Sequence, residues 1–240
     1  MDWRERVYKT YLSHYVIPAK GEPTIEKIEK QFYAWDVYYG RLLPKNKEAV
    51  ILDAGCGTGE IVHWLRKLGF KNAIGIELDF KQTEAAKNLG ISGILSGDFR
   101  ESLKDKKNSY DCIIARDVIE HFDKNEILET LDLFYNSLKI GGLLIIQTPN
   151  AESPFGSRHR YCDFTHSLSF TETSLNHALK TASFKEVGFY PVRPVAHGIK
   201  SLIRLILWGF IETLIGFYLL IETGSGKGIF TQNMVAAAKK

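Results

Sequence analysis

Cysteine is scarce in this chain of 240 residues, which contains only three. Cys56, Cys112 and Cys162 lie far apart and form no Cys-x-x-Cys pair, so the sequence predicts neither a disulfide framework nor a zinc knuckle. Free thiols favour a reducing cytoplasm as the setting. The first residues, MDWRERVYKTYLSHY, mix charges with aromatics and lack the apolar region of a signal peptide.

A strong excess of one charge is also missing, since 31 basic residues face 28 acidic residues and the net charge is +3. This balance is too even to predict nucleic-acid binding, and we expect no nucleic-acid partner. Internal repeats and low-complexity segments are absent as well. A hydrophobic content of 45% predicts a sizeable core, built mainly in one domain.

Short apolar runs alternate with segments of helical periodicity through the middle of the chain. The predicted strands are 49–55, 72–79, 92–98, 110–117 and 141–150, and the predicted helices are 61–69, 81–90 and 124–138. This alternation predicts parallel β-α-β units in an open sheet, whose ligands bind at the carboxyl ends of the strands. Further strands are expected at 183–192 and 231–240, and a helix capped by Thr24 at 24–38.

A glycine-rich loop, DAGCGTGE at 53–60, follows the first predicted strand. Its three glycines at alternate positions allow a tight turn and a close approach of the backbone to a ligand. A nicotinamide-binding fingerprint would need another glycine where Glu60 stands, which counts against a dehydrogenase. The acidic Asp53 favours a cationic ligand group, and a plain tight turn is the alternative.

The stretch LDAGCGTGE closely resembles the first motif of the class I S-adenosylmethionine-dependent methyltransferases. The resemblance continues in order through GIELD (75–79), GDF (97–99), YDCIIARDVIEHF (110–122) and LKIGGLLIIQTPN (138–150). It implies S-adenosylmethionine as cofactor and an α/β, Rossmann-like seven-stranded sheet, mostly parallel with the last strand antiparallel. Residues 1–45 are expected to form an N-terminal helical cap, and 46–240 the cofactor-binding domain with an apolar helical insertion at 197–225 between strands six and seven.

The resemblance implies a role for an acidic residue at the end of each early strand. Glu77 would take the ribose hydroxyls, because a carboxylate accepts hydrogen bonds from both, and Asp79 is the less favoured alternative. Asp98 would bind the adenine amine, and Phe99 would pack on the ring. A helix cap or a surface acid is the other interpretation of each single residue. The expected cofactor-binding residues are Asp53, Gly55, Cys56, Gly57, Glu77, Leu78, Asp98, Phe99 and Arg116.

Methyl transfer from a sulfonium is an in-line displacement, and an alcohol acceptor needs help in losing its proton. The expected catalytic residues are His166, His121 and Asp163. Asp163 and His166, in RHRYCDFTH at 158–166, are expected to act as orienter and base. His121 follows the fourth strand at the rim of the cofactor pocket, where bracing the helix start is its alternative role.

The polar loop after the fifth strand is expected to face the acceptor. Pro154 and Gly156 predict irregular structure in its first part, 150–160. A similar D-x-T-H segment occurs in bacterial methyltransferases of sugars and lipid-linked glycans, which implies a hydroxyl of such a molecule as acceptor. The expected acceptor-binding residues are Arg158, His159 and Arg160. The loop offers an incomplete ligand set, so no metal is expected.

Three alternatives stay open for this loop and for the activity. The loop could be pinned by its own hydrogen bonds, without contacting an acceptor. The acceptor could instead be a membrane-soluble small molecule such as a quinone precursor. The chain could also be a cofactor-binding scaffold without catalysis.

The segment 202–221 is nearly all apolar and long enough to span a membrane. A span is not expected, because the strands at 183–192 and 231–240 belong to one sheet. Gly209 and Gly216 are expected to break the segment into short helices. It could cover the pocket, pack on its own domain, form a homodimer interface, or dip into a membrane surface. Membrane contact would place the protein on the cytoplasmic, inner face.

Overall fold

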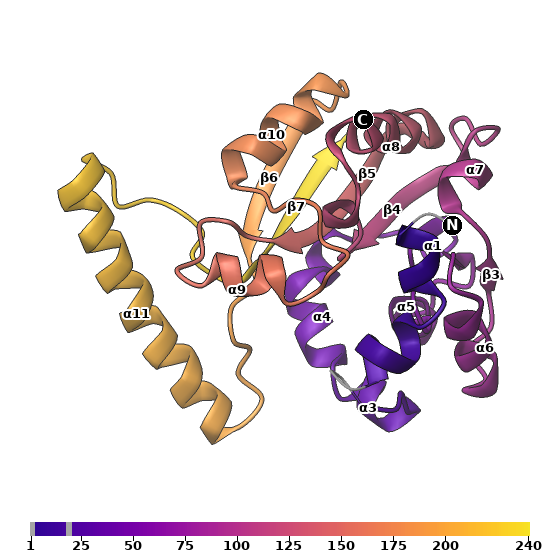
Figure 1. The fold of residues 1–240 in the computed structure, drawn as a ribbon, viewed down its shortest axis with the longest axis horizontal. Helices are drawn as coiled ribbons and strands as arrows, with labels where there is room; N and C mark the ends of the chain where they lie inside the picture. The colour runs from indigo at the N-terminus through magenta and orange to yellow at the C-terminus, as the bar shows by residue number, and fades with distance from the viewer. Residues whose placement is uncertain (1–2, 18–20) are drawn as a thin grey trace.

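A computed structural model of the protein describes residues 3–17 and 21–240 (Figure 1). Seven strands form one sheet in the order β3-β2-β1-β4-β5-β7-β6. Their bounds are β1 Ile51–Ala54, β2 Ala73–Glu77, β3 Ile94–Ser96, β4 Tyr110–Arg116, β5 Leu138–Pro149, β6 Glu186–Pro191 and β7 Asn233–Lys239. Strands β1 to β5 are parallel, and β7 is antiparallel to both β5 and β6. The expected α/β, Rossmann-like sheet with an antiparallel last strand is confirmed.

Helices connect the strands and cover both faces of the sheet (Figure 1). After the N-terminal segment they are α5 Glu60–Lys67, α6 Phe80–Asn88, α7 Phe99–Leu103, η3 Ile119–His121, α8 Lys124–Ser137, α9 Gly156–Tyr161, α10 Glu172–Thr181 and α11 Ile199–Thr223. Two hydrophobic clusters lie on opposite faces of the sheet, because alternate residues of a strand point to opposite sides. Leu52 belongs to the cluster with Phe134 of α8, and Ile51 to the cluster with Trp64 of α5.

The N-terminal segment contains α1 Trp3–Tyr8, η1 Leu12–Val16, α3 Ile25–Glu29, α4 Phe32–Tyr38 and η2 Gly40–Leu42. Thr24 caps α3 by accepting a hydrogen bond from the Lys27 amide, as predicted. The single helix predicted at 24–38 is wrong, because it divides into α3 and α4. The Gln31 amide donates to the Ile28 carbonyl, a tighter turn than an α-helix makes.

The irregular loop predicted at 150–160 is wrong in its second half, where α9 forms. Pro154 lies just before the helix, where it removes no helical hydrogen bond. Gly156 is buried, and a Cβ on it would come 2.9 Å from the Asn150 carbonyl oxygen. This glycine therefore serves a close backbone approach at the helix start, and it does not break the helix.

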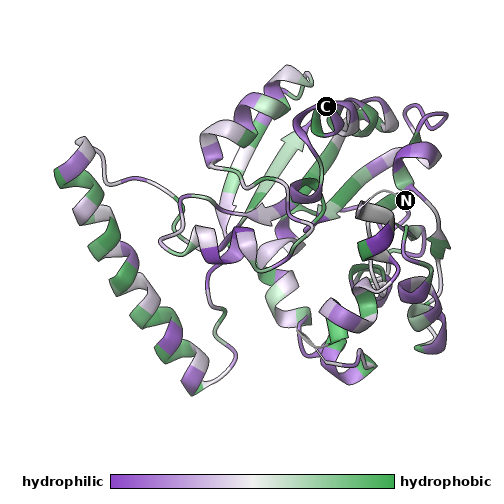
Figure 2. Ribbon diagram, in the orientation of Figure 1, coloured by the Kyte–Doolittle hydropathy of each residue, from purple (hydrophilic) through white to green (hydrophobic). Residues whose placement is uncertain are grey.

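The apolar insertion forms one continuous helix of 25 residues, α11, which stands apart from the sheet (Figure 1). The predicted breaks at Gly209 and Gly216 are wrong. A glycine costs a helix only about 1 kcal/mol relative to alanine, which the surrounding Leu and Ile residues tolerate. In the most apolar 18-residue window of α11 no residue is buried. This excludes the alternative in which the segment is buried against its own domain. By length and composition alone, α11 could cross a membrane, and Figure 2 shows it mainly green, with white and purple segments between the apolar ones.

Gly75 in β2 allows the glycine-rich loop to pack directly against the sheet. A Cβ at this position would lie 2.5 Å from the Sγ and 2.7 Å from the Cβ of Cys56. We expect Gly75→Ala to lower the free energy of unfolding by about 1–3 kcal/mol, as overpacking does. Urea unfolding measures this change, and Gly40→Ala is the control, because no atom lies within 4 Å of a Cβ there. Equal effects of the two substitutions would contradict the packing argument.

Candidate active site

One cavity of about 400 Å³ opens at the carboxyl ends of the parallel strands. From the expected cofactor set it is lined by Gly55, Cys56, Gly57, Glu77, Leu78, Asp98, Phe99 and Arg116. From the expected acceptor and catalytic sets it is lined by His121, His159, Asp163 and His166. The fold therefore brings two groups of residues, far apart in sequence, to one cavity. Asp53, Arg158 and Arg160 lie outside its lining.

The glycine-rich loop is fixed to the end of β2 by its backbone. Gly55 and Gly57 have φ angles of 72° and 55°, a left-handed conformation that favours glycine. The Gly55 amide donates to the Ile76 carbonyl, and the Gly57 amide donates to the Glu77 carboxylate at 2.8 Å. A Cβ on Gly55 would come 2.7 Å from Val118, so a larger residue would distort the loop.

Glu77 is nearly buried at the end of β2 and presents its carboxylate to the cavity. One oxygen accepts from the Gly57 amide and the other from the Asp79 amide, each at 2.8 Å. Each oxygen keeps a further lone pair, which suits a pair of hydroxyls. Burial raises the pKa of Glu77, and these amides act against that rise. Asp79 instead caps α6 through the Lys81 amide, so the geometry favours Glu77 for a ribose.

Asp53 lies behind the loop, with one carboxylate oxygen, Oδ2, buried and without a hydrogen-bond partner. Burial raises the pKa of Asp53 to about 7, although the nearby Arg116 opposes the shift. Arg116 forms an ion pair with Glu60 at 2.6 Å. Glu60 stands where the nicotinamide-binding fingerprint has a glycine. Its side chain therefore holds Arg116 in the cavity lining.

The residues expected at the adenine are already engaged by the protein. Asp98 caps α7 through the Arg100 amide at 2.8 Å and pairs with the Arg100 guanidinium at 3.0 Å. Phe99 stacks on Phe134 with ring centroids 5.6 Å apart and is 7% exposed. Leu78 is 55% exposed at the cavity and offers more apolar surface to a ring. Adenine binding by Asp98 and Phe99 stays a prediction.

Asp163 is a buried residue of the cavity lining and connects to His121 through Thr165. Its carboxylate accepts from the Thr165 amide at 2.8 Å, from the Thr165 hydroxyl at 2.6 Å and from the Tyr11 hydroxyl. The same Thr165 hydroxyl oxygen lies 2.8 Å from Nδ1 of His121. Burial acts to raise the pKa of Asp163, but these hydrogen bonds leave the pKa below its ordinary value.

His166 is held by the backbone of its own loop, with Nδ1 donating to the His159 carbonyl at 3.2 Å. The predicted orientation of His166 by the Asp163 side chain needs correction. The Asp163 carboxylate accepts a hydrogen bond from the Thr165 hydroxyl, and that hydroxyl contacts Nδ1 of His121. The two imidazole rings lie 4.9 Å apart and at 70° to each other. Burial and the neighbouring His166 lower the pKa of His121 to about 4, and burial lowers the pKa of His166. Both imidazoles are therefore harder to protonate than a histidine side chain in water.

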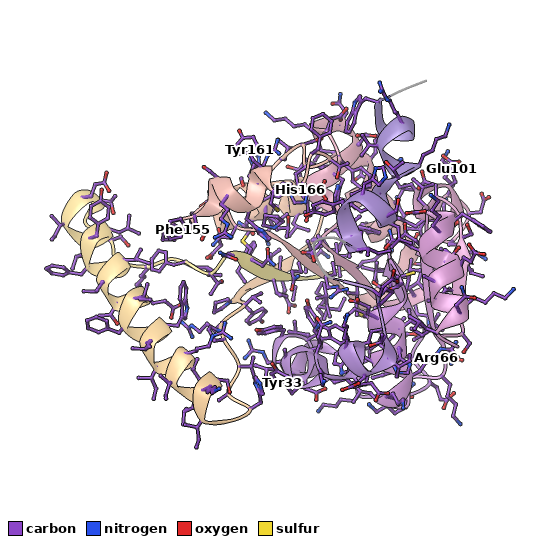
Figure 3. The ribbon with its side chains drawn as sticks, turned by 60° about the horizontal axis from the view of Figure 1, so that its bottom comes forward. Tyr33, Arg66, Glu101, Phe155, Tyr161 and His166 are labelled. Carbon is purple, nitrogen blue, oxygen red and sulfur yellow. The ribbon has the colours of Figure 1, made fainter. Side chains whose placement is uncertain are left out.

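The basic residues of the loop do not all reach the cavity. Arg160 donates to the carbonyls of His166 and Ser167 and so braces the loop, which corrects its expected contact with the acceptor. Arg158 is exposed and outside the cavity lining. His159 lines the cavity and lies 2.8 Å from the Asn233 side chain. Figure 3 labels His166 on the side of α9 that faces the rest of the protein.

Sequence reasoning missed two tyrosines of the N-terminal segment. Tyr11 and Tyr15 line the cavity with ring centroids 5.2 Å apart, and the Tyr15 hydroxyl lies 3.7 Å from Sγ of Cys162. Their spacing of four residues places them on one side of a helical segment, which is the signal that could have found them. This segment therefore contributes side chains to the cavity lining, while residues 1–2 and 18–20 of the expected cap lie outside the described part.

A family model described as a methyltransferase domain matches residues 28–187. The chain belongs to this methyltransferase family. The methyltransferase is similar in fold to an S-adenosylmethionine-dependent methyltransferase from Archaeoglobus fulgidus, with a TM-score of 0.65, 21% identity and coverage of 90% of this chain and 97% of the other. It is also similar to phosphoethanolamine N-methyltransferase 2 of Haemonchus contortus in complex with S-adenosyl-L-methionine, with a TM-score of 0.59, 14% identity and coverage of 97% and 60%.

Two curated proteins match parts of this methyltransferase in sequence. An uncharacterized protein of Methanocaldococcus jannaschii is 32% identical over 114 residues, which are 48% of this chain and 42% of that protein. The tRNA U34 carboxymethyltransferase of Helicobacter acinonychis is 29% identical over 155 residues, covering 56% of this chain and 55% of that protein. The chain thus spans about half the length of the curated relatives it matches.

The cofactor of this methyltransferase is S-adenosylmethionine. The cavity fits it in two ways that follow from the described contacts. The glycine-rich loop leaves no side chain at Gly55 or Gly57 to block a close approach, and Glu77 keeps acceptor capacity for two hydroxyls. These residues would hold the nucleoside part of the cofactor at the ends of β1 and β2.

Proposed function

We propose that this methyltransferase methylates a hydroxyl of a glycan or lipid-linked sugar at a membrane surface. The single observation that carries the proposal is the shared cavity, in which the cofactor loop and the His121 and His166 side chains line one space. Methyl transfer requires the acceptor to lie in line with the methyl group, so both sites must open into each other.

S-adenosylmethionine, when bound, supplies a methyl group that its positive sulfonium already activates. The protein then has to position the acceptor and help it lose a proton, because an alcohol is a poor nucleophile. His121 and His166 assist this loss, and the Asp163 carboxylate orients His121 through Thr165. Tyr11 and Tyr15 of the N-terminal segment line the same cavity.

The exposed apolar surface of α11 supports an acceptor that is attached to a lipid. Large apolar side chains are exposed along this helix, among them Leu207 (57%), Phe210 (64%), Leu214 (53%) and Phe217 (61%). Contiguous exposed apolar surface of this kind marks an interaction site. Histidine, carboxylate and tyrosine side chains line the acceptor side of the cavity, which suits a sugar hydroxyl.

The sheet restricts how α11 can meet a bilayer. Pro191 at the end of β6 pairs with Met234 at the start of β7, so both connections to α11 leave from the same place. The helix is about 37 Å long, and the returning segment 224–232 extends at most about 30 Å. A spanning helix would force this segment back through lipid with unsatisfied backbone groups. We therefore propose that α11 lies in the plane of the membrane interface.

Replacing His166 should slow the chemical step. We expect His166→Ala to lower kcat by about 10²–10⁴-fold, the contribution of a proton-transfer group, while the affinity for S-adenosylmethionine stays unchanged. The measurement is release of S-adenosylhomocysteine with a panel of sugar and lipid-linked sugar acceptors. His177→Ala on α10 is the control, because this histidine is exposed and outside the cavity lining. Unchanged turnover would transfer the role to His121, and cofactor binding without turnover on any acceptor would indicate a scaffold.

A further inference from the structure

Three potential metal ligands meet in the wall of the cavity. Glu120, His121 and His166 each offer a ligand atom, and these atoms lie within 4.8 Å of one another. Glu120 and His121 belong to η3 after β4, whereas His166 belongs to the loop after α9. All three residues line the cavity. The cluster thus joins two segments that the sequence keeps more than forty residues apart.

The Glu120 carboxylate is buried, and its hydrogen bonding is incomplete. Its side chain is 0% exposed, and its Oε2 accepts a hydrogen bond from the Thr148 hydroxyl at 3.1 Å. Its Oε1 is buried and has no hydrogen-bond partner. Within residues 3–17 and 21–240, no Lys or Arg forms an ion pair with it. A buried carboxylate in this position is costly unless a proton or a cation joins it.

Hydrogen bonds at Nδ1 fix the orientation of both imidazole rings, an arrangement that is usual for metal-ligating histidines. Nδ1 of His166 donates to the His159 carbonyl, and a neutral ring with this hydrogen bond carries its lone pair on Nε2. Nδ1 of His121 contacts the Thr165 hydroxyl, which in turn donates to Asp163. In that tautomer His121 also carries its lone pair on Nε2. Ligating histidines commonly use one ring nitrogen for the metal and the other for a carbonyl or a carboxylate.

We propose that Glu120, His121 and His166 bind one divalent transition-metal cation, such as Zn²⁺ or Mn²⁺. Two imidazole nitrogens and one carboxylate oxygen favour transition metals over Mg²⁺ or Ca²⁺, which prefer oxygen ligands. Three protein ligands leave coordination positions open toward the cavity, as in catalytic sites. The expectation of no metal rested on the loop residues alone, and the missing ligands come from η3.

The catalytic use of this cation rests on the proposed function, although the binding site does not. The acceptor hydroxyl would coordinate the cation, which lowers the pKa of the hydroxyl, and its proton leaves to water. The oxygen then forms a bond to the methyl carbon while the carbon–sulfur bond breaks, so the sulfonium becomes a neutral thioether. His121 and His166 thereby assist deprotonation as ligands of the cation.

Calorimetric titration of the chelator-treated full-length protein with ZnCl₂, and separately with MnCl₂, tests the site without cofactor or acceptor. We expect one saturable equivalent in the wild type and at least a tenfold loss of affinity in Glu120→Gln and in His166→Ala, about the loss that outer-shell changes already cause. His177→Ala should bind the cation as the wild type does. The bound cation should also raise the Tm of the wild type and leave that of Glu120→Gln nearly unchanged.

Titration of the same proteins with S-adenosylmethionine shows that the variants are folded. Variants that keep this binding and lose the cation support the site. The inference is overturned if the wild type saturates with neither cation, or if Glu120→Gln and His166→Ala bind it as the wild type does. A wild type that turns over an acceptor without any cation would refute the catalytic use of the cation and leave the proposed function intact. Saturable, Glu120-dependent cation binding without turnover would support the site and count against the proposed function.

Discussion

Glu77→Ala is expected to reduce the affinity for S-adenosylmethionine by about 100-fold or more. The carboxylate would accept hydrogen bonds from two ribose hydroxyls, and hydrogen bonds to a charged group contribute about 1.5–3 kcal/mol each. The substitution also removes the acceptor for the Gly57 amide, which holds the glycine-rich loop at the end of β2. Since 1.4 kcal/mol is a tenfold change, these losses together account for the expected effect.

Isothermal titration calorimetry with S-adenosylmethionine measures this change, and Glu84→Ala provides the control. Glu84 lies exposed on α6, so its loss changes the net charge equally without touching the cavity. Glu77→Gln should lie between the wild type and Glu77→Ala, because an amide oxygen still accepts from the Gly57 amide. If Glu77→Ala lowers the affinity for S-adenosylmethionine by less than about tenfold, another residue binds the ribose. Asp79 would then be the next residue to replace.

Charges on the exposed face of α11 should abolish binding to lipid vesicles. Phe210, Leu214 and Phe217 are each more than half exposed, and burying such a side chain in the interface contributes on the order of 1 kcal/mol. Replacing all three by Glu removes these contributions and adds repulsion from anionic lipids. We expect the wild type to float with vesicles containing anionic lipid and the triple variant to lose at least about 100-fold in partitioning.

Vesicle flotation and light scattering together separate the alternatives for α11. Ile140→Glu is the control, because Ile140 is 91% exposed at the start of β5 and lies outside α11. Affinity for S-adenosylmethionine should stay unchanged in the triple variant, since no α11 residue lines the cavity. A wild type that stays out of the vesicles and forms dimers, which the triple variant loses, would assign the helix to a homodimer interface.

The cofactor side of the site could be largely anticipated from the order of residues in the chain. Each strand of a parallel sheet ends at the same edge, so the residues that follow β1 and β2 necessarily gather there. Gly55, Gly57 and Glu77 accordingly lie at one cavity. The local signal of a helix start was equally reliable at Thr24, which caps α3 through a contact within one turn.

The acceptor side could not be anticipated in the same way. Whether Asp163 orients His166 or His121 depends on the Thr165 hydroxyl, which lies between the carboxylate and the ring of a distant segment. Glu120 becomes a candidate metal ligand only because it is buried and because His166, more than forty residues away in sequence, lies close to it. Arg160 looked available for an acceptor, yet its guanidinium donates to the carbonyls of its own loop.

The alternation of apolar runs and helical periods predicted an open α/β sheet with ligands at its strand ends, and the motifs that resemble the class I methyltransferases implied the seven-stranded sheet and its cofactor. These features depend on interactions within one element or between consecutive elements, which the order of residues encodes directly. The direction of the Asp163 carboxylate, the Glu120–His121–His166 cluster and the exposure of α11 depend on side chains from segments far apart in the chain. Their relative positions follow from packing of the whole sheet and its loops, and no local pattern contains that information.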